Sequence, residues 1–166
     1  DGDTYNYSVE LFEAKFPLRI TEYSLNINDG AGAGYWRGGF GAIREFEILI
    51  NDAHTYCSFG RSIEKPWGLK GGKEGTNNYM EIIRNGIVKR VSRISHQELS
   101  KGDKLRVVTG GGGGFGSPLE RPISLVHEDF INGYISNEVA KLDFGVVIDK
   151  NGKVDNIETT RLREGQ

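Results

Sequence analysis

The chain has 166 residues, enough for one domain or for one domain and a tail. Its net charge of -2, its scattered basic residues and its lack of a long apolar run lead us to expect neither nucleic acid nor a membrane as a partner. The single cysteine, Cys57, excludes an internal disulfide and suits a reducing compartment, so we expect a cytoplasmic protein.

Strand-like alternation dominates the first half of the chain. Tyr23, Leu25 and Ile27 alternate with polar residues, and a similar pattern returns in residues 40–50. Because neighbours on a strand point to opposite faces, this alternation predicts half-buried strands. We therefore expect extended segments over residues 4–12, 18–28, 40–50 and 53–59.

The clearest local signal lies between residues 79 and 91. Two β-rich runs flank Asn85 and Gly86, and both of these residues tolerate the positive φ that a two-residue hairpin turn requires. The sequence therefore predicts a hairpin closed by this pair. A second turn signal, at residues 101–103, leads into a short strand over residues 104–109.

The hydrophobic period changes to that of helices after residue 117. Pro122 suits the first turn of a helix, and Gly133 can end it. Ser136 can cap a second short helix that ends at Gly145. A last strand over residues 146–148 and a last short helix over residues 156–163 complete the predicted elements.

These elements predict a mainly β fold: a β-sandwich or barrel-like body of about eight strands, with a short C-terminal helical tail. We expect the β-rich body, with its glycine-rich loops, over residues 1–116. The C-terminal helices and last strand are expected over residues 117–166, packed on the body as one unit. Because the chain begins with Asp1, we also expect a fragment or processed subunit of something longer.

The glycine run at residues 110–116 needs a physical reason, since ordering five consecutive glycines costs much backbone entropy. A phosphate cradle is disfavoured because no lysine follows the last glycine. A structural or interface loop that packs against another segment is favoured. From the sequence alone, we expect Gly112→Leu and Gly113→Leu to leave the fold largely intact but to impair assembly or turnover.

Candidate catalytic groups do not converge in this sequence. The three histidines lack the spacing of metal ligands. His127, Glu128 and Asp129 would point about 100° apart on a helix, which favours a solvated helix face. A calcium-like start at residues 149–153 has Thr160 where the twelfth-position acid should stand. We therefore assign no catalytic residue and no metal ligand.

Two tryptophans stand in the glycine-rich loops, Trp36 beside Arg37 and Trp67 after Pro66. A tryptophan in a loop packs either on the core of its own chain or on a partner. Both alternatives stay open, because aromatic residues and arginine are also common interface anchors.

Several segments of the chain carry recognisable motifs. They are VELFEAKFPLRI at residues 9–20, GAGAGYWRGGFG at 30–41 with Arg44 and Glu45 after it, PWGLKGG at 66–72, GGGGFGSPLER at 111–121, DFINGYIS at 129–136 and FGVV at 144–147. Taken together, they resemble one family, hydantoinase B/oxoprolinase. The resemblance covers nearly the whole chain in the right order, with Ser117 where the family usually has Asp.

This resemblance implies ATP-dependent cleavage of cyclic amides such as hydantoin or 5-oxoproline. An alternative within the family is a component of an ATP-dependent carboxylase of acetone or acetophenone. It further implies that ATP and a divalent metal serve the full complex, with the metal ligands upstream and none in this chain. The chain would be a C-terminal domain or small subunit that is not catalytic alone.

The implied partners are the upstream part of the same B-type subunit, an ATP-binding A-type subunit and a small cyclic amide or ketone substrate. We expect interface or site-closing loops at Arg37, Trp67, Gly111, Gly112, Gly113, Gly114 and Phe115. A non-enzymatic β-sandwich that binds sugar or a protein partner remains an alternative of another class. The sequence leaves open which substrate is used, and whether the reaction is hydrolysis or carboxylation.

Overall fold

The computed structural model describes residues 6–165, and their contacts group into two compact units. The first unit comprises the chain up to residue 25, residues 42–62 and residues 78–109, and the second comprises residues 26–41, 63–77 and 110 onward. The glycine-rich loops were expected with the strands, but their contacts group them with the helices. The first two loops connect strands of the first unit, and the third directly follows a strand of that unit, so the order of elements along the chain does not reveal this grouping.

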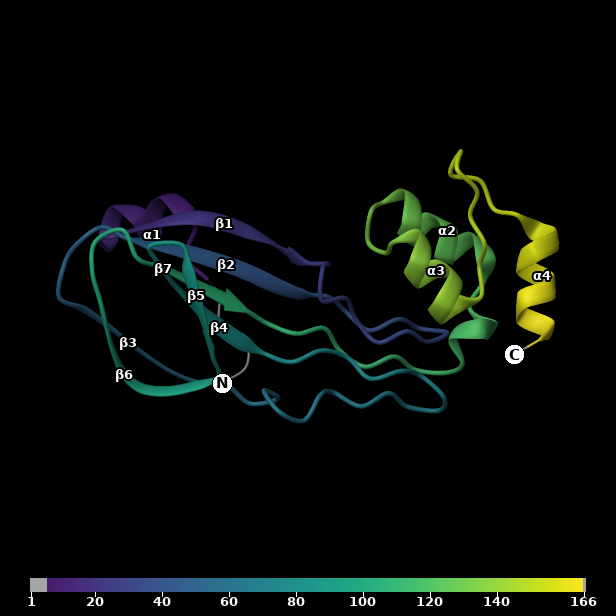
Figure 1. Ribbon diagram of the computed structural model, residues 1–166, viewed down its shortest axis with the longest axis horizontal. Coiled ribbons are helices and arrows are strands. Elements are labelled where there is room, and N and C mark those ends of the chain that lie inside the picture. Colours follow the sequence, from purple (N-terminus) through teal and green to yellow (C-terminus); the bar gives the residue numbers. More distant parts are fainter. Residues whose placement is uncertain (1–5, 166) are drawn as a thin grey trace. The chain divides into compact units, whose positions relative to one another are not determined.

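The first unit is built from two sheets (Figure 1). The larger sheet has five strands in the order β1-β2-β7-β4-β5, and the smaller sheet pairs β3 with β6. The expected mainly β body is therefore confirmed, with seven strands in residues 6–165. The strands are β1 (Leu18–Asn26), β2 (Gly41–Ile48), β3 (Ala53–Ser58), β4 (Tyr79–Arg84), β5 (Ile87–Val91), β6 (Arg93–Leu99) and β7 (Lys104–Val108).

A short helix, α1 (Val9–Lys15), precedes the first strand. The expected extended conformation is therefore wrong over residues 9–12, and residues 4 and 5 lie outside the described residues. The Ser8 hydroxyl accepts a hydrogen bond from the Leu11 amide at 3.3 Å, which caps the helix. Phe12 then packs on Phe46 of β2, with 5.5 Å between ring centroids.

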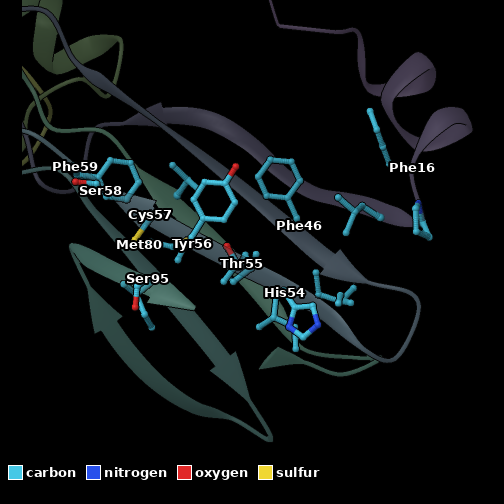
Figure 2. Close-up of a pocket in the computed structure, with 18 of the residues that line it drawn as sticks. Phe16, Phe46, His54, Thr55, Tyr56, Cys57, Ser58, Phe59, Met80 and Ser95 are labelled. Atoms are coloured by element: carbon cyan, nitrogen blue, oxygen red, sulfur yellow. The ribbon is translucent and has the colours of Figure 1, made fainter. Parts of the chain in front are cut away.

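The core of the first unit lies between its two sheets and is open along one side. Ile48, Met80, Ile82 and Leu99 are its buried members. Beside them runs an apolar groove of about 1050 Å³, bordered by α1, the large sheet and β3 (Figure 2). Such a groove is unusual for a sandwich, because two full sheets would close over their shared core.

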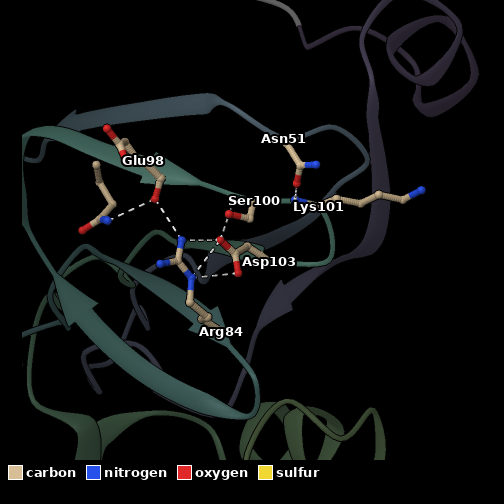
Figure 3. Close-up of polar contacts among 7 residues, drawn as sticks. Asn51, Arg84, Glu98, Ser100, Lys101 and Asp103 are labelled. Atoms are coloured by element: carbon tan, nitrogen blue, oxygen red, sulfur yellow. Dashed lines mark hydrogen bonds and ion pairs between the residues drawn. The ribbon is translucent and has the colours of Figure 1, made fainter.

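An ion pair holds the turn between β6 and β7 (Figure 3). The Arg84 guanidinium donates to the Asp103 carboxylate at 2.6 Å, and the Ser100 amide donates to the same carboxylate at 2.8 Å. The hydrogen bond from Arg84 is the main cause that lowers the pKa of the Asp103 carboxyl, and it outweighs the opposing effect of burial.

We expect this pair to make the first unit sensitive to acid. The folded Asp103 carboxyl has a lowered pKa, so the unfolded chain binds more protons as the pH falls, and stability is lost below the ordinary Asp range. Asp103→Asn should flatten the fall in unfolding free energy between about pH 5 and pH 2. Urea denaturation followed by far-UV circular dichroism measures this slope. The exposed turn residue Asp52, changed to Asn, is the matched control, and equal slopes for both variants would contradict the assignment.

The predicted hairpin is confirmed. Strands β4 and β5 pair antiparallel with Arg84 opposite Ile87, and Asn85 and Gly86 form the turn with φ of 51° and 77°. Both angles lie in the left-handed region, which is the geometry that favours an Asn-Gly pair in a two-residue turn.

Gly86→Val should destabilise the first unit by about 1–3 kcal/mol, because a β-branched residue strains at positive φ. The space around Gly86 is open, with no atom within 4 Å of an added Cβ. The loss of stability would therefore come from backbone strain and not from a steric clash. Gly60 also has open space but no positive φ, and Gly60→Val is therefore the control. Similar denaturation midpoints for the two variants would refute this explanation.

The second unit contains the remaining helices: η1 (Pro118–Glu120), α2 (Ile123–Ile131), α3 (Asn137–Phe144) and α4 (Asn156–Glu164). The predicted cap is confirmed, since the Ser136 hydroxyl accepts from the Val139 amide at 3.1 Å and Gly145 ends α3 with a φ of 63°. The expected last strand reduces to a single bridge between Ile148 and Val154. No helix within residues 6–165 is long and apolar enough to cross a membrane.

The core of the second unit gathers residues from the helices and from one glycine-rich loop. Val126 of α2 and Phe144 of α3 are almost fully buried. Ala33, from the first glycine-rich loop, belongs to the same cluster, which ties that loop to the helices. The remaining buried members are Ala140, Val146 and Ile148.

Candidate functional site

Three glycine-rich segments of the second unit, residues 30–39, 66–76 and 110–116, lie side by side as a bundle of extended backbones. The third segment is hydrogen-bonded to both of the others. Gly112 accepts from the Gly32 amide at 2.8 Å, while the Gly114 amide donates to the Lys73 carbonyl at 2.9 Å. The first and second segments also meet, through the Lys73 amide and the Ala33 carbonyl at 2.7 Å. We call these three segments the glycine bundle.

Close packing explains why the bundle needs glycine. A Cβ on Gly111 would lie 2.3 Å from the Gly30 carbonyl oxygen, and one on Gly113 would lie 2.1 Å from that of Trp67. Gly112 differs, since its nearest neighbour would be 3.7 Å away. Missing side chains therefore let three backbones approach one another. The expectation that the run packs against another segment is thus met within this chain.

The glycine bundle carries an exposed apolar patch. Phe115 forms an antiparallel bridge with Trp36 and a parallel bridge with Leu69, so the three side chains are neighbours on one face. Their exposed fractions are 58% for Trp36, 54% for Leu69 and 43% for Phe115. We call these three residues the aromatic patch. Trp67, 63% exposed, stands two residues before Leu69.

A buried ionic cluster joins the first glycine-rich loop to α2. Arg37 donates through Nε and Nη2 to the two carboxylate oxygens of Asp129, at 3.1 and 3.2 Å. Arg121 donates to the same carboxylate at 2.9 Å and to the Tyr35 carbonyl at 2.9 Å. Asp129 and Arg121 are each only 7% exposed. Because two guanidinium groups share one buried carboxylate, the cluster fixes the loop on the helix.

The expected site residues fall into two groups. The glycines let the backbones of the bundle pack closely and Arg37 ties its first segment to α2, whereas Trp67 and Phe115 present apolar surface to solvent. Sequence reasoning missed Leu69 and the burial of Asp129. The expected solvated face at Asp129 is wrong, and a helical spacing of three residues from Val126 could have shown that Asp129 faces inward.

Arg44 and Glu45 follow the first glycine-rich loop, on β2 of the first unit. The Arg44 guanidinium lies over the rings of Phe12, Tyr23 and Phe46, at 5.1–5.2 Å from their centroids. Burial raises the pKa of the Glu45 carboxyl, but hydrogen bonds from Lys104 and Thr21 outweigh it, and the pKa is lowered overall. Both side chains are thereby held in place on the sheet.

The glycine bundle consists of closely packed backbone, and its exposed side chains in the patch are apolar. Within residues 6–165, no group of three or more His, Cys, Asp or Glu side chains could hold a metal ion. Asp149, at the calcium-like segment, accepts hydrogen bonds from the amides of Asn151 and Lys153. Its carboxylate thus organises a turn.

A family model described as hydantoinase B/oxoprolinase matches residues 1–118. The chain belongs to the hydantoinase B/oxoprolinase family. The match includes the glycine bundle up to its last residue and the whole aromatic patch. The resemblance carried by the glycine-rich motifs is therefore confirmed.

Relatives in the family are much longer than this chain. A Pseudomonas sp. (strain NS671) protein, provisionally named as the B-type subunit of a D-/L-hydantoinase, is 33% identical over 98% of the chain. The beta subunit of caprolactamase from Pseudomonas jessenii is 34% identical over 95% of it. The chain spans 28% of the length of each of these relatives.

Two solved structures share the fold of this chain. The crystal structure of the ATP-dependent caprolactamase from Pseudomonas jessenii superposes with a TM-score of 0.84 at 33% identity, over 95% of this chain and 28% of that one. Nucleotide-free acetone carboxylase superposes with a TM-score of 0.83 at 21% identity, over 96% of this chain and 26% of that one. The second likeness shows the fold alone.

Proposed function

We propose that this chain is the C-terminal domain, or a small subunit, of an ATP-dependent enzyme that opens cyclic amides. The observation that carries the proposal is the likeness to the beta subunit of caprolactamase over 95% of the chain, with the fold retained. The name of that relative describes part of an ATP-dependent lactam-opening enzyme. In this proposal, ATP and a divalent metal bind elsewhere in the complex, on an A-type subunit and on the upstream part of the B-type subunit.

The glycine bundle would act as a rigid docking element in that complex. Arg37 and the run from Gly111 to Gly114 hold the backbone in place, and Trp67 and Phe115 contact the neighbouring part of the enzyme. Exposed aromatic side chains on a rigid support lose little conformational entropy on binding, which suits them as interface anchors. The loops would close the site without donating a catalytic group.

Co-purification tests the proposal directly. The tagged chain, expressed in its source cell, is expected to bring down hydantoinase A-like and B-like polypeptides, identified by mass spectrometry. ATP hydrolysis by this complex should rise with hydantoin, 5-oxoproline or caprolactam. Phe115→Ala should reduce recovery of the partners, whereas Ile63→Ala, on an exposed side chain outside the patch, should not.

Ketone substrates decide between hydrolysis and carboxylation. Stimulation of ATP hydrolysis by acetone or acetophenone with bicarbonate, but by no cyclic amide, would replace the proposal with the carboxylase alternative. Recovery of the chain without partners, combined with micromolar binding of Mg-ATP to the chain alone in calorimetry, would reject the assigned division of labour.

A further inference from the structure

The apolar groove of the first unit reaches the free edge of β3. Its floor is formed by Phe46 and Ile48 of β2 with side chains of β4 and β7, and Phe12 and Phe16 form the wall on the α1 side. Phe46 and Phe16 are seen across the groove from β3 in Figure 2. The opposite wall is β3 itself, whose residues from Ala53 to Ser58 all border the groove, as does Phe59 directly after the strand.

The unbroken run of lining residues shows that the backbone of β3, and not only one face of its side chains, borders the groove, as do Arg93, Ile94 and Ser95 of β6. The small sheet contains only β3 and β6, which leaves the other edge of β3 unpaired among residues 6–165. The Phe59 amide donates toward β6, to the Ser92 carbonyl at 2.9 Å. The neighbouring Ser58 amide therefore points away from β6, toward the groove.

Apolar side chains around the groove remain uncovered. No residue of α1 is buried, although the helix carries Leu11, which is 51% exposed. Phe16 is 39% exposed and Tyr56 is 82% exposed. The lining residues include no Asp, Glu or Lys, and they include one arginine, Arg93. A covering segment is thus expected to be apolar on one face and neutral or acidic near Arg93.

We propose that one extended segment, from the portion of hydantoinase B-type proteins that this chain does not span, adds to β3 as a third strand and fills the groove. The inference rests on the proposed function, since it takes the chain to be part of such a protein. Nearly three quarters of each long relative lies outside the match, which supplies the missing chain. Adding a strand forms hydrogen bonds with the unpaired backbone groups of β3, and it also buries alternate apolar side chains of the added segment in the groove.

Peptides provide the first test. Overlapping peptides of about 12 residues, covering the part of the Pseudomonas jessenii caprolactamase beta subunit outside its match, are titrated against the chain by fluorescence anisotropy. At least one peptide with alternating apolar residues should bind above its scrambled version. Ser58→Pro, which removes the outward amide, should weaken that binding about tenfold. Ser58→Thr keeps the amide and should bind normally.

A second variant avoids any change to the backbone. Arg93→Glu reverses the charge at the end of the groove and should weaken a peptide that carries an acidic residue there. The proposal is overturned if no peptide exceeds its scrambled control, or if Ser58→Pro and Ser58→Thr bind alike. It is also overturned if light scattering shows a dimer that Ser58→Pro dissociates, because the occupant would then be a second copy.

A chimera separates this inference from the proposed function. This chain replaces the matching region of the caprolactamase beta subunit, and hydrogen exchange of the Ser58 amide is compared with that in the isolated chain. Slow exchange only in the chimera supports the added strand, even if the chimera lacks ATP-dependent lactam opening. An active chimera with fast exchange at Ser58 overturns the added strand and leaves the proposed function standing.

Discussion

Gly113→Ala is expected to destabilise the second unit by about 2–3 kcal/mol. The new methyl group would lie 2.1 Å from the Trp67 carbonyl oxygen and 3.0 Å from the Gly68 amide nitrogen. Both obstacles are backbone atoms of the adjoining segment, so no side chain can rotate aside. Relief requires the two segments to separate, which weakens the hydrogen bonds of the glycine bundle.

Gly112→Ala is the matched control one residue away. Its methyl group would find the nearest atom at 3.7 Å, an ordinary contact distance. We expect the stability of this variant to be unchanged or slightly raised, since alanine restricts the unfolded chain. Both tryptophans belong to the second unit, so tryptophan fluorescence during urea denaturation reports on that unit. Equal midpoints for the two variants would show that the bundle is looser than its distances indicate.

This contrast revises what the sequence predicted for the two glycines. Gly112→Leu and Gly113→Leu were expected to behave alike and to spare the fold, because both positions look the same within a glycine run. The structure distinguishes them by what lies opposite, on a segment distant in the sequence. Gly113→Leu is therefore expected to impair folding before assembly can be tested.

Local signals in the sequence were reliable where the residues of a short segment themselves determine its conformation. Asn85 and Gly86 predicted the hairpin through their tolerance of positive φ, and Ser136 predicted a helix cap through its hydroxyl. Alternation failed for residues 9–12, where Ser8 caps a helix and Phe12 packs on Phe46. A short amphipathic segment fits both periods, so tertiary packing decides its conformation.

Features that depend on distant segments could not be predicted in the same way. The motifs located the glycine bundle, but not the pairing of Phe115 with both Trp36 and Leu69. The groove beside β3 exists because the small sheet contains two strands, which no property of residues 53–58 reveals. Arg37, the partner of Asp129, stands 92 positions away along the chain, so the helical spacing could show that Asp129 faces inward but not which residue it pairs with.

Asp129→Asn is expected to destabilise the second unit by about 3–5 kcal/mol. The carboxylate accepts hydrogen bonds from Arg37 and Arg121. Asp129 and Arg121 are buried, and the Arg37 side chain is 16% exposed. An amide of the same shape would remove the negative charge and turn one acceptor into a donor that faces a guanidinium. One buried and one largely buried cation would then lack their counter-charge, which is the main source of the loss.

Asp143→Asn is the control of the same chemistry. Asp143 pairs with Lys73 at 2.7 Å, but these side chains are 32% and 49% exposed, so the pair is worth no more than about 1 kcal/mol. Urea denaturation followed by tryptophan fluorescence should separate the two variants clearly. If Asp129→Asn lowers the free energy of unfolding no more than Asp143→Asn does, the buried cluster does not fix the first glycine-rich loop on α2. The rigidity assigned to the aromatic patch would then need another source, since Arg37 stands directly after Trp36.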